Sequence, residues 1–105
     1  MKVILSDFTK REIQETARYV RKEFGKRSKE SFLQKVRETR RLLADNPYLG
    51  PIEPLLADRA QTYRSVVVGK LNKLVYYVEE DEKVIYVVAF WDVRREPQAL
   101  AGEVK

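Results

Sequence analysis

Apolar residues recur in the first 45 residues with the spacing of two amphipathic helices. The first stripe runs at spacings of four, three and four residues, through Ile13, Ala17, Val20 and Phe24. The second repeats these spacings, through Phe32, Val36, Thr39 and Leu43. Side chains with this spacing share one face of an α-helix, and such a face usually packs against a core. We therefore predict two helices whose apolar stripes, including Phe24 and Phe32, are buried.

The ends of both predicted helices carry start and stop signals. Ser6 or Asp7 is suited to cap the first helix, which Gly25 ends, and Ser28 is suited to cap the second. The second helix is expected to end near residue 45, ahead of an Asn-Pro dipeptide. Because so few residues separate the helices, they are predicted to form an antiparallel hairpin.

The second half of the chain contains three short apolar segments separated by two polar turns. The segments, residues 63–68, 71–78 and 84–91, are rich in β-branched and aromatic residues. The turns are Gly69-Lys70 and an acidic run over 79–82, and both are too short for a parallel crossover. They predict an antiparallel meander, to which residues 2–5 add a strand at an edge or at the centre. Helical hairpin and sheet together predict a two-layer α+β domain.

A two-residue loop at Gly69-Lys70 predicts a register for the first two strands of the meander. Arg64 then pairs with Val75, and Lys73 lies on the same face as Arg64. The opposite face is the better candidate for the core and consists of Tyr63, Ser65, Val67, Leu74, Tyr76 and Val78. Two interpretations of the cations remain open. They form a functional or partner surface, or they lie along the sheet with their charged ends in water.

Residues 46–61 form the one long irregular stretch and contain three of the four prolines. A link of this length in a small domain is usually functional or tightly packed. Leu55 and Leu56 are predicted to attach it to the core. After the last strand, residues 98–104 are predicted to form one helical turn or a mobile tail.

Composition narrows the classes of function. The chain has 105 residues, which predicts a single domain, residues 1–105. It has no Cys and no His, which excludes disulfides, thiolate metal sites and imidazole catalysis. No apolar run is long enough to span a membrane, and residues 1–7 do not resemble a signal peptide, so we expect a cytoplasmic protein. A net charge of +5 favours anionic partners.

Several motifs, in this order, resemble the RelE/ParE superfamily of bacterial type II toxins. After a strand and a helical hairpin come an Asn-Pro-x-x-Gly break over 46–50, the pair Tyr63-Arg64, a Lys-Leu-Val-Tyr-Tyr strand over 73–77, and an Arg-Arg-x-Pro end over 94–97. The resemblance covers nearly the whole chain. It implies a twisted antiparallel sheet of about four strands with the N-terminal strand and helical hairpin packed on it. It also implies a plasmid-stabilisation-like operon with a cognate antitoxin, and no cofactor or metal.

The superfamily divides by target. RelE-like members are ribosome-dependent endoribonucleases (mRNA interferases) that hold the scissile phosphate with cations on the sheet. That catalytic set is matched by position by Arg64, Lys73 and Arg95. Arg94 is a further candidate. Guanidinium and ammonium groups suit it because positive charge stabilises a phosphorane. The usual Tyr or His near the C-terminus has no counterpart, since the last tyrosine is Tyr86.

ParE-like members instead inhibit growth by poisoning DNA gyrase and need no nuclease residues. The missing terminal Tyr or His and the long basic first helix favour this branch. Arg64, Lys73, Arg94 and Arg95 would then be binding residues for gyrase or the antitoxin. Val66, Val75 and Trp91 would receive apolar side chains of the antitoxin, although Trp91 is also interpreted as a core residue. A non-toxic, antitoxin-binding member of the fold is the third possibility. The toxin is expected to be a monomer or dimer that forms a larger complex with its antitoxin.

Overall fold

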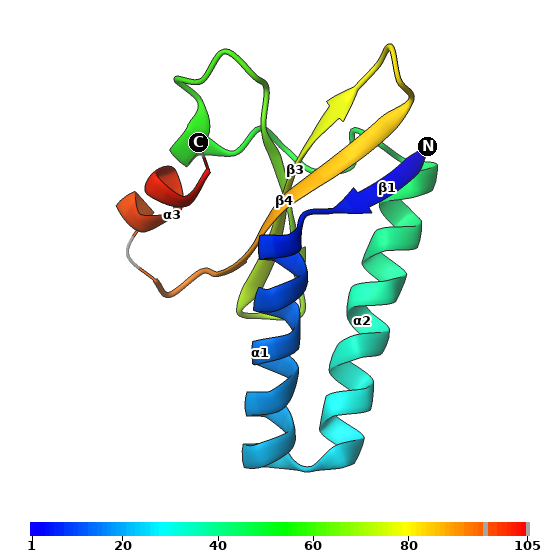
Figure 1. The fold of residues 1–105 in the computed structure, drawn as a ribbon, viewed down its shortest axis with the longest axis vertical. Helices are drawn as coiled ribbons and strands as arrows, with labels where there is room; N and C mark the ends of the chain where they lie inside the picture. Colours follow the sequence, from blue (N-terminus) through cyan, green and yellow to red (C-terminus); the bar gives the residue numbers. More distant parts are fainter. Residues whose placement is uncertain (96, 105) are drawn as a thin grey trace.

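The protein is a helical hairpin packed on one face of a four-stranded sheet, as the computed structural model shows for residues 1–95 and 97–104 (Figure 1). In chain order the elements are β1 (Lys2–Leu5), α1 (Asp7–Phe24), α2 (Lys26–Asp45), a short 3-10 helix η1 (Pro54–Leu56), β2 (Arg64–Val68), β3 (Asn72–Glu79), β4 (Val84–Asp92) and α3 (Pro97–Glu103). The predicted hairpin, meander and α+β class are confirmed.

The hairpin forms where the capping residues predict it, with one difference at its turn. Ser6 caps α1, because its Oγ accepts a hydrogen bond from the Thr9 backbone N–H (3.0 Å). Gly25 adopts φ +93°, a backbone conformation that glycine reaches at low cost. It is the single residue between the two helices. The prediction of Ser28 as the second N-cap is therefore wrong. Ser28 lies inside α2, where its hydroxyl donates to the Phe24 carbonyl (3.1 Å).

The sheet has the order β1-β4-β3-β2, and β1 lies at its edge. Two antiparallel pairings join β2, β3 and β4, as predicted, but β1 runs parallel to β4, which makes the sheet mixed. The expectation of an all-antiparallel sheet is wrong at this pairing. Short turns force antiparallel neighbours, whereas the whole hairpin and the meander separate β1 from β4 in sequence, so no turn fixes their relative direction.

The predicted register between β2 and β3 is wrong by one residue. Arg64 pairs with Tyr76 and Val67 with Lys73, because the loop contains Leu71 as well as Gly69 and Lys70. The carbonyl of Leu71 instead accepts from the N–H of Val93 (2.8 Å). A slip of one residue turns every side chain of a strand to the other face. Arg64 and Lys73 consequently lie on opposite faces of the sheet.

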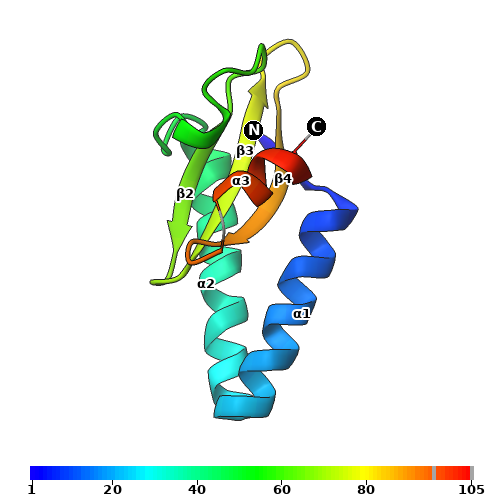
Figure 2. The same cartoon turned by 90° about the vertical axis from the view of Figure 1, so that its left-hand side faces the viewer.

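Both faces of the sheet are covered, which corrects the expectation of a single buried face. The hairpin covers a cluster that contains Val3, Ile13, Val36, Leu43, Val68, Leu74, Tyr76, Ile85, Val87 and Phe90. On the other face, η1 and α3 cover a second cluster, which contains Leu56, Tyr63, Val75, Ala89, Trp91, Leu100 and Val104 (Figure 2). Of the two leucines predicted to attach the long loop, Leu56 is buried and Leu55 is exposed. The C-terminal residues form a helix docked on the sheet.

The hairpin extends past the sheet at its turn (Figure 1). Part of its apolar stripe is exposed there. Phe24, in the last turn of α1, is therefore 66% exposed, and its predicted burial is wrong. Leu43, near the other end of the hairpin, is completely buried, and Val36 is buried as well.

Candidate functional site

Lys73 is held by a carboxylate under the long irregular loop. Its ammonium forms an ion pair with the Glu53 carboxylate, whose side chain is 1% exposed, while that of Lys73 is 15% exposed. Glu53 is fixed in turn, because its backbone N–H donates to the Tyr63 carbonyl (2.8 Å). Burial lowers the pKa of Lys73. The predicted site cation thus lies, ion-paired and largely buried, on the face that η1 and α3 cover.

Arg64 lies on the hairpin face and organises the Asn-Pro-x-x-Gly break. Its Nη1 donates to the Gly50 carbonyl (2.9 Å), and its guanidinium lies 5.2 Å from the centre of the Tyr48 ring. The backbone N–H of Gly50 donates to the hydroxyl oxygen of Tyr76 (2.9 Å), and burial raises the pKa of this hydroxyl. Arg64 and Tyr76, which are paired across β2 and β3, therefore hold opposite polar groups of the same glycine.

Arg94 and Arg95 follow β4, and each has a different partner. Arg94 contacts the Asp92 carboxylate with Nε (3.1 Å) and Nη2 (2.7 Å), and these hydrogen bonds lower the pKa of Asp92. Arg95 lies 4.2 Å above the ring of Trp91 and 3.8 Å from the carboxylate of Glu12 in α1. The Arg-Arg-x-Pro motif continues into Glu96, which lies outside the described residues.

Trp91 is 1% exposed and belongs to the cluster beneath α3, as its interpretation as a core residue predicts. Val75 is fully buried in the same cluster, whereas Val66 is partly buried against the hairpin. Trp91 and Val75 are thus not accessible to a partner while α3 is docked. At the edge of this region Val93, Arg94 and Arg95 are exposed to solvent.

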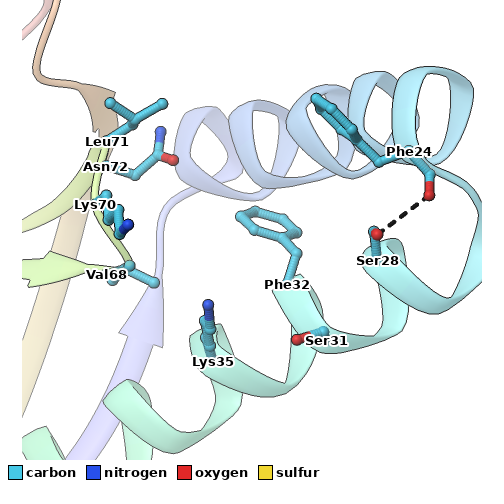
Figure 3. A pocket seen from close by; sticks show the side chains of 10 residues that line it. Phe24, Ser28, Ser31, Phe32, Lys35, Val68, Lys70, Leu71 and Asn72 are labelled. Carbon is cyan, nitrogen blue, oxygen red and sulfur yellow. Dashed lines mark hydrogen bonds between the residues drawn. The ribbon is translucent and has the colours of Figure 1, made fainter.

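The sequence did not predict an apolar groove beside the turn of the hairpin. Two adjoining hollows of ≈ 410 and ≈ 480 Å³ share Phe24, Leu71 and Asn72 in their linings, and we call them together the hairpin groove. Figure 3 shows its first hollow, with Phe24 and Phe32 from the helices on one side, and Val68 at the end of β2 with Lys70 and Leu71 of the β2–β3 turn on the other. The second adds Tyr19, Val20 and Phe90. The sequence contained one signal for this groove, because the apolar stripe of α1 continues to Phe24, the last residue of the helix.

A strand, a helical hairpin and a meander with this connectivity make up the fold of the RelE/ParE toxins. The chain matches, over residues 3–97, the family described as the ParE toxin of the type II toxin-antitoxin system, parDE, and it belongs to that family. It is therefore the toxin component of a type II toxin-antitoxin system and has a cognate antitoxin as its partner. The RelE/ParE resemblance and its ParE-like branch are confirmed. No curated protein matches the chain.

Two further observations concern the described residues alone. Neither long helix there has an apolar stretch sufficient to cross a bilayer. Within residues 1–95 and 97–104, no three carboxylates are grouped in a way that could hold a metal ion.

Proposed function

We propose that this toxin inhibits growth by poisoning DNA gyrase, and that it cuts no nucleic acid. The observation that carries the proposal is the separation of Arg64 from Lys73 on opposite faces of the sheet. Stabilising a phosphorane requires donors that lie about 3 Å from the oxygens of the same phosphate. Arg64 is bonded to Gly50 and Lys73 to Glu53, so no single phosphate reaches both. Membership of the ParE family also supports a gyrase target.

The primary test separates the possible targets in cells. Expression without antitoxin is expected to stop DNA synthesis within minutes and to induce the DNA-damage response, while protein synthesis falls only later. Pulse labelling with thymidine and with methionine measures the two processes separately, and purified toxin should inhibit supercoiling by purified gyrase. Early loss of translation would support a ribosomal nuclease instead, and loss of neither process would support a non-toxic member of the fold.

We also propose that an apolar segment of the antitoxin that carries acidic residues occupies the first hollow of the hairpin groove. Lys35 and Lys70 line the hollow nearest the β2–β3 turn, and no carboxylate lines it. The same hollow is lined by the exposed Phe24 and Leu71, which provide the apolar contact area. The charge of this hollow therefore complements carboxylates, and its apolar lining complements Leu- or Phe-like side chains.

Phe24→Ala is expected to weaken the complex with the antitoxin encoded beside the toxin gene by about 30-fold, the loss typical of an aromatic hot spot. Isothermal titration calorimetry with the purified pair measures this loss. Since the Phe24 side chain is mostly exposed, stability should change little. Val67→Ala removes a similarly exposed apolar side chain (61%) from the opposite face and serves as the control. Equal affinities for the two variants would place the antitoxin elsewhere.

A further inference from the structure

The whole net positive charge of the chain lies in the helical hairpin. Residues 7–45 contain 12 Lys and Arg against 7 Asp and Glu, and the remaining residues contain 9 of each. Within the described residues, the ion pairs are Arg59–Asp58, Lys73–Glu53, Arg94–Asp92 and Arg95–Glu12. None of the hairpin's own cations takes part in them. The hairpin is thus a source of positive potential that the protein does not neutralise internally.

Three of these cations form a stripe on the side of α2 that faces β1. Arg37, Arg40 and Arg41 have the spacing i, i+3, i+4, which places them on one side of a helix. Together with Lys2, Val3 and Ala44 they line a hollow of ≈ 510 Å³, and no carboxylate lines it. We call the three residues the arginine stripe.

Hydrogen bonds to neutral acceptors orient two of the three guanidinium groups. Arg40 donates from Nη2 to the Val3 carbonyl on the edge of β1 (2.9 Å). Arg37 donates from Nε (3.3 Å) and Nη2 (3.0 Å) to the Gln34 side-chain oxygen. Because these acceptors carry no charge, the positive charge remains available, and each guanidinium keeps further N–H donors for an anion.

We propose that the arginine stripe binds the phosphate backbone of duplex DNA. Guanidinium groups bind phosphate oxygens through paired hydrogen bonds. The apolar members of the lining are Val3 and Ala44, so it offers no aromatic surface on which bases could stack. Stacking is the usual means of holding single strands, and its absence from this lining favours a duplex contacted through its backbone alone, without sequence preference.

The stripe is separate from the hairpin groove, so the two can be occupied together. Arg37 follows Gly25 by 12 residues, which places it about 18 Å along α2 from the turn. Figure 1 shows that β1 lies beside the end of α2 that is far from the turn of the hairpin. The stripe lines a hollow together with Lys2 and Val3 of β1, whereas Phe24 and Ser28 beside the turn line the groove. DNA binding here goes beyond the proposed action on gyrase and does not depend on it.

The test measures binding of the purified toxin to a fluorescein-labelled duplex of about 20 base pairs by anisotropy over a range of salt concentrations. The variant Arg37→Gln/Arg40→Gln/Arg41→Gln is expected to bind about 10- to 100-fold more weakly at low salt. Its plot of log K against log salt should be shallower by about 2.7, the value for three released counterions. The double variant Arg37→Gln/Arg41→Gln keeps the contact of Arg40 with β1 and should be shallower by about 1.8.

A control of equal charge distinguishes the stripe from the general attraction of a basic protein. Lys70→Gln/Lys83→Gln/Arg94→Gln also removes three positive charges, all from exposed residues outside the hairpin, and should lose less than about threefold in affinity. Equal losses in the two triple variants would overturn the proposal, as would the absence of measurable duplex binding. Binding of a single-stranded oligonucleotide as tightly as the duplex would also overturn it, and would assign the stripe to single strands.

Discussion

Glu53→Ala is expected to lower the free energy of unfolding by about 3 kcal/mol or more, because it leaves the ammonium of Lys73 buried without a counter-charge. Urea denaturation followed by the fluorescence of the single tryptophan, Trp91, measures the loss. Burial sets the pKa of Lys73 below its ordinary value of 10.5, so the folded state releases its proton at lower pH than the unfolded state does. The stability of the variant should therefore rise with pH through the interval between these two pKa values.

Removing both charges together provides the control. In Glu53→Leu/Lys73→Met, apolar side chains of similar volume replace the pair, so stability should return to within about 1 kcal/mol of the wild type or exceed it. If this double variant is as unstable as Glu53→Ala, the ion pair is not the cause of the loss. The double variant also tests function. A gyrase poison should remain toxic, whereas a nuclease that uses Lys73 should lose on the order of a hundredfold in activity.

Gly50→Ala is expected to destabilise the protein by about 3 kcal/mol, at the upper end of the range for overpacking. An added Cβ would lie 2.2 Å from the carbonyl oxygen of Ser65 and 2.7 Å from its carbonyl carbon. These are backbone atoms of β2, so they cannot move aside without disturbing the sheet. The hydrogen bonds from Arg64 and to Tyr76 at Gly50 should weaken at the same time. Thermal unfolding followed by circular dichroism measures the change.

Gly102→Ala is the matched control for this substitution. A Cβ at Gly102 meets no atom within 4 Å, and the residue lies in α3, where alanine is favoured over glycine. We expect no loss of stability and a gain of up to about 1 kcal/mol. A Gly50→Ala protein as stable as the Gly102→Ala protein would mean that the loop after α2 can move away from β2.

The sequence predicted the local elements well, because each depends on signals close together in the chain. The spacing of Ile13 and Ala17 defines a helix, and Gly25 ends it. Relations between distant segments were not predictable in the same way. The direction of β1 depends on its fit beside β4, and the register of β2 depends on whether Leu71 belongs to a turn or to a strand. Each of these choices is decided by packing across the whole domain.

In the candidate site, too, local features were predictable from the sequence, whereas relations between distant segments were not. Motif order identified the toxin family and drew attention to Arg64 and Lys73. Their separation followed from the one-residue register slip, and the partner of Lys73 lies in an irregular loop whose path has no periodic signal. The hairpin groove depends on how far the turn of the hairpin extends past the sheet, which the periodicity within one helix does not indicate.

The docking of α3 affects the solubility of the protein, because this helix covers apolar side chains of the sheet. Leu100 and Val104 cover the same cluster as Trp91, and Arg59 donates to the carbonyls of Ala101 and Val104 at the end of this helix. Trimming the chain ahead of Leu100, by a protease or by the choice of expression boundary, would uncover the indole of Trp91 and the side chain of Val75. We therefore expect that a C-terminal truncation or tag that displaces α3 exposes apolar surface and promotes aggregation.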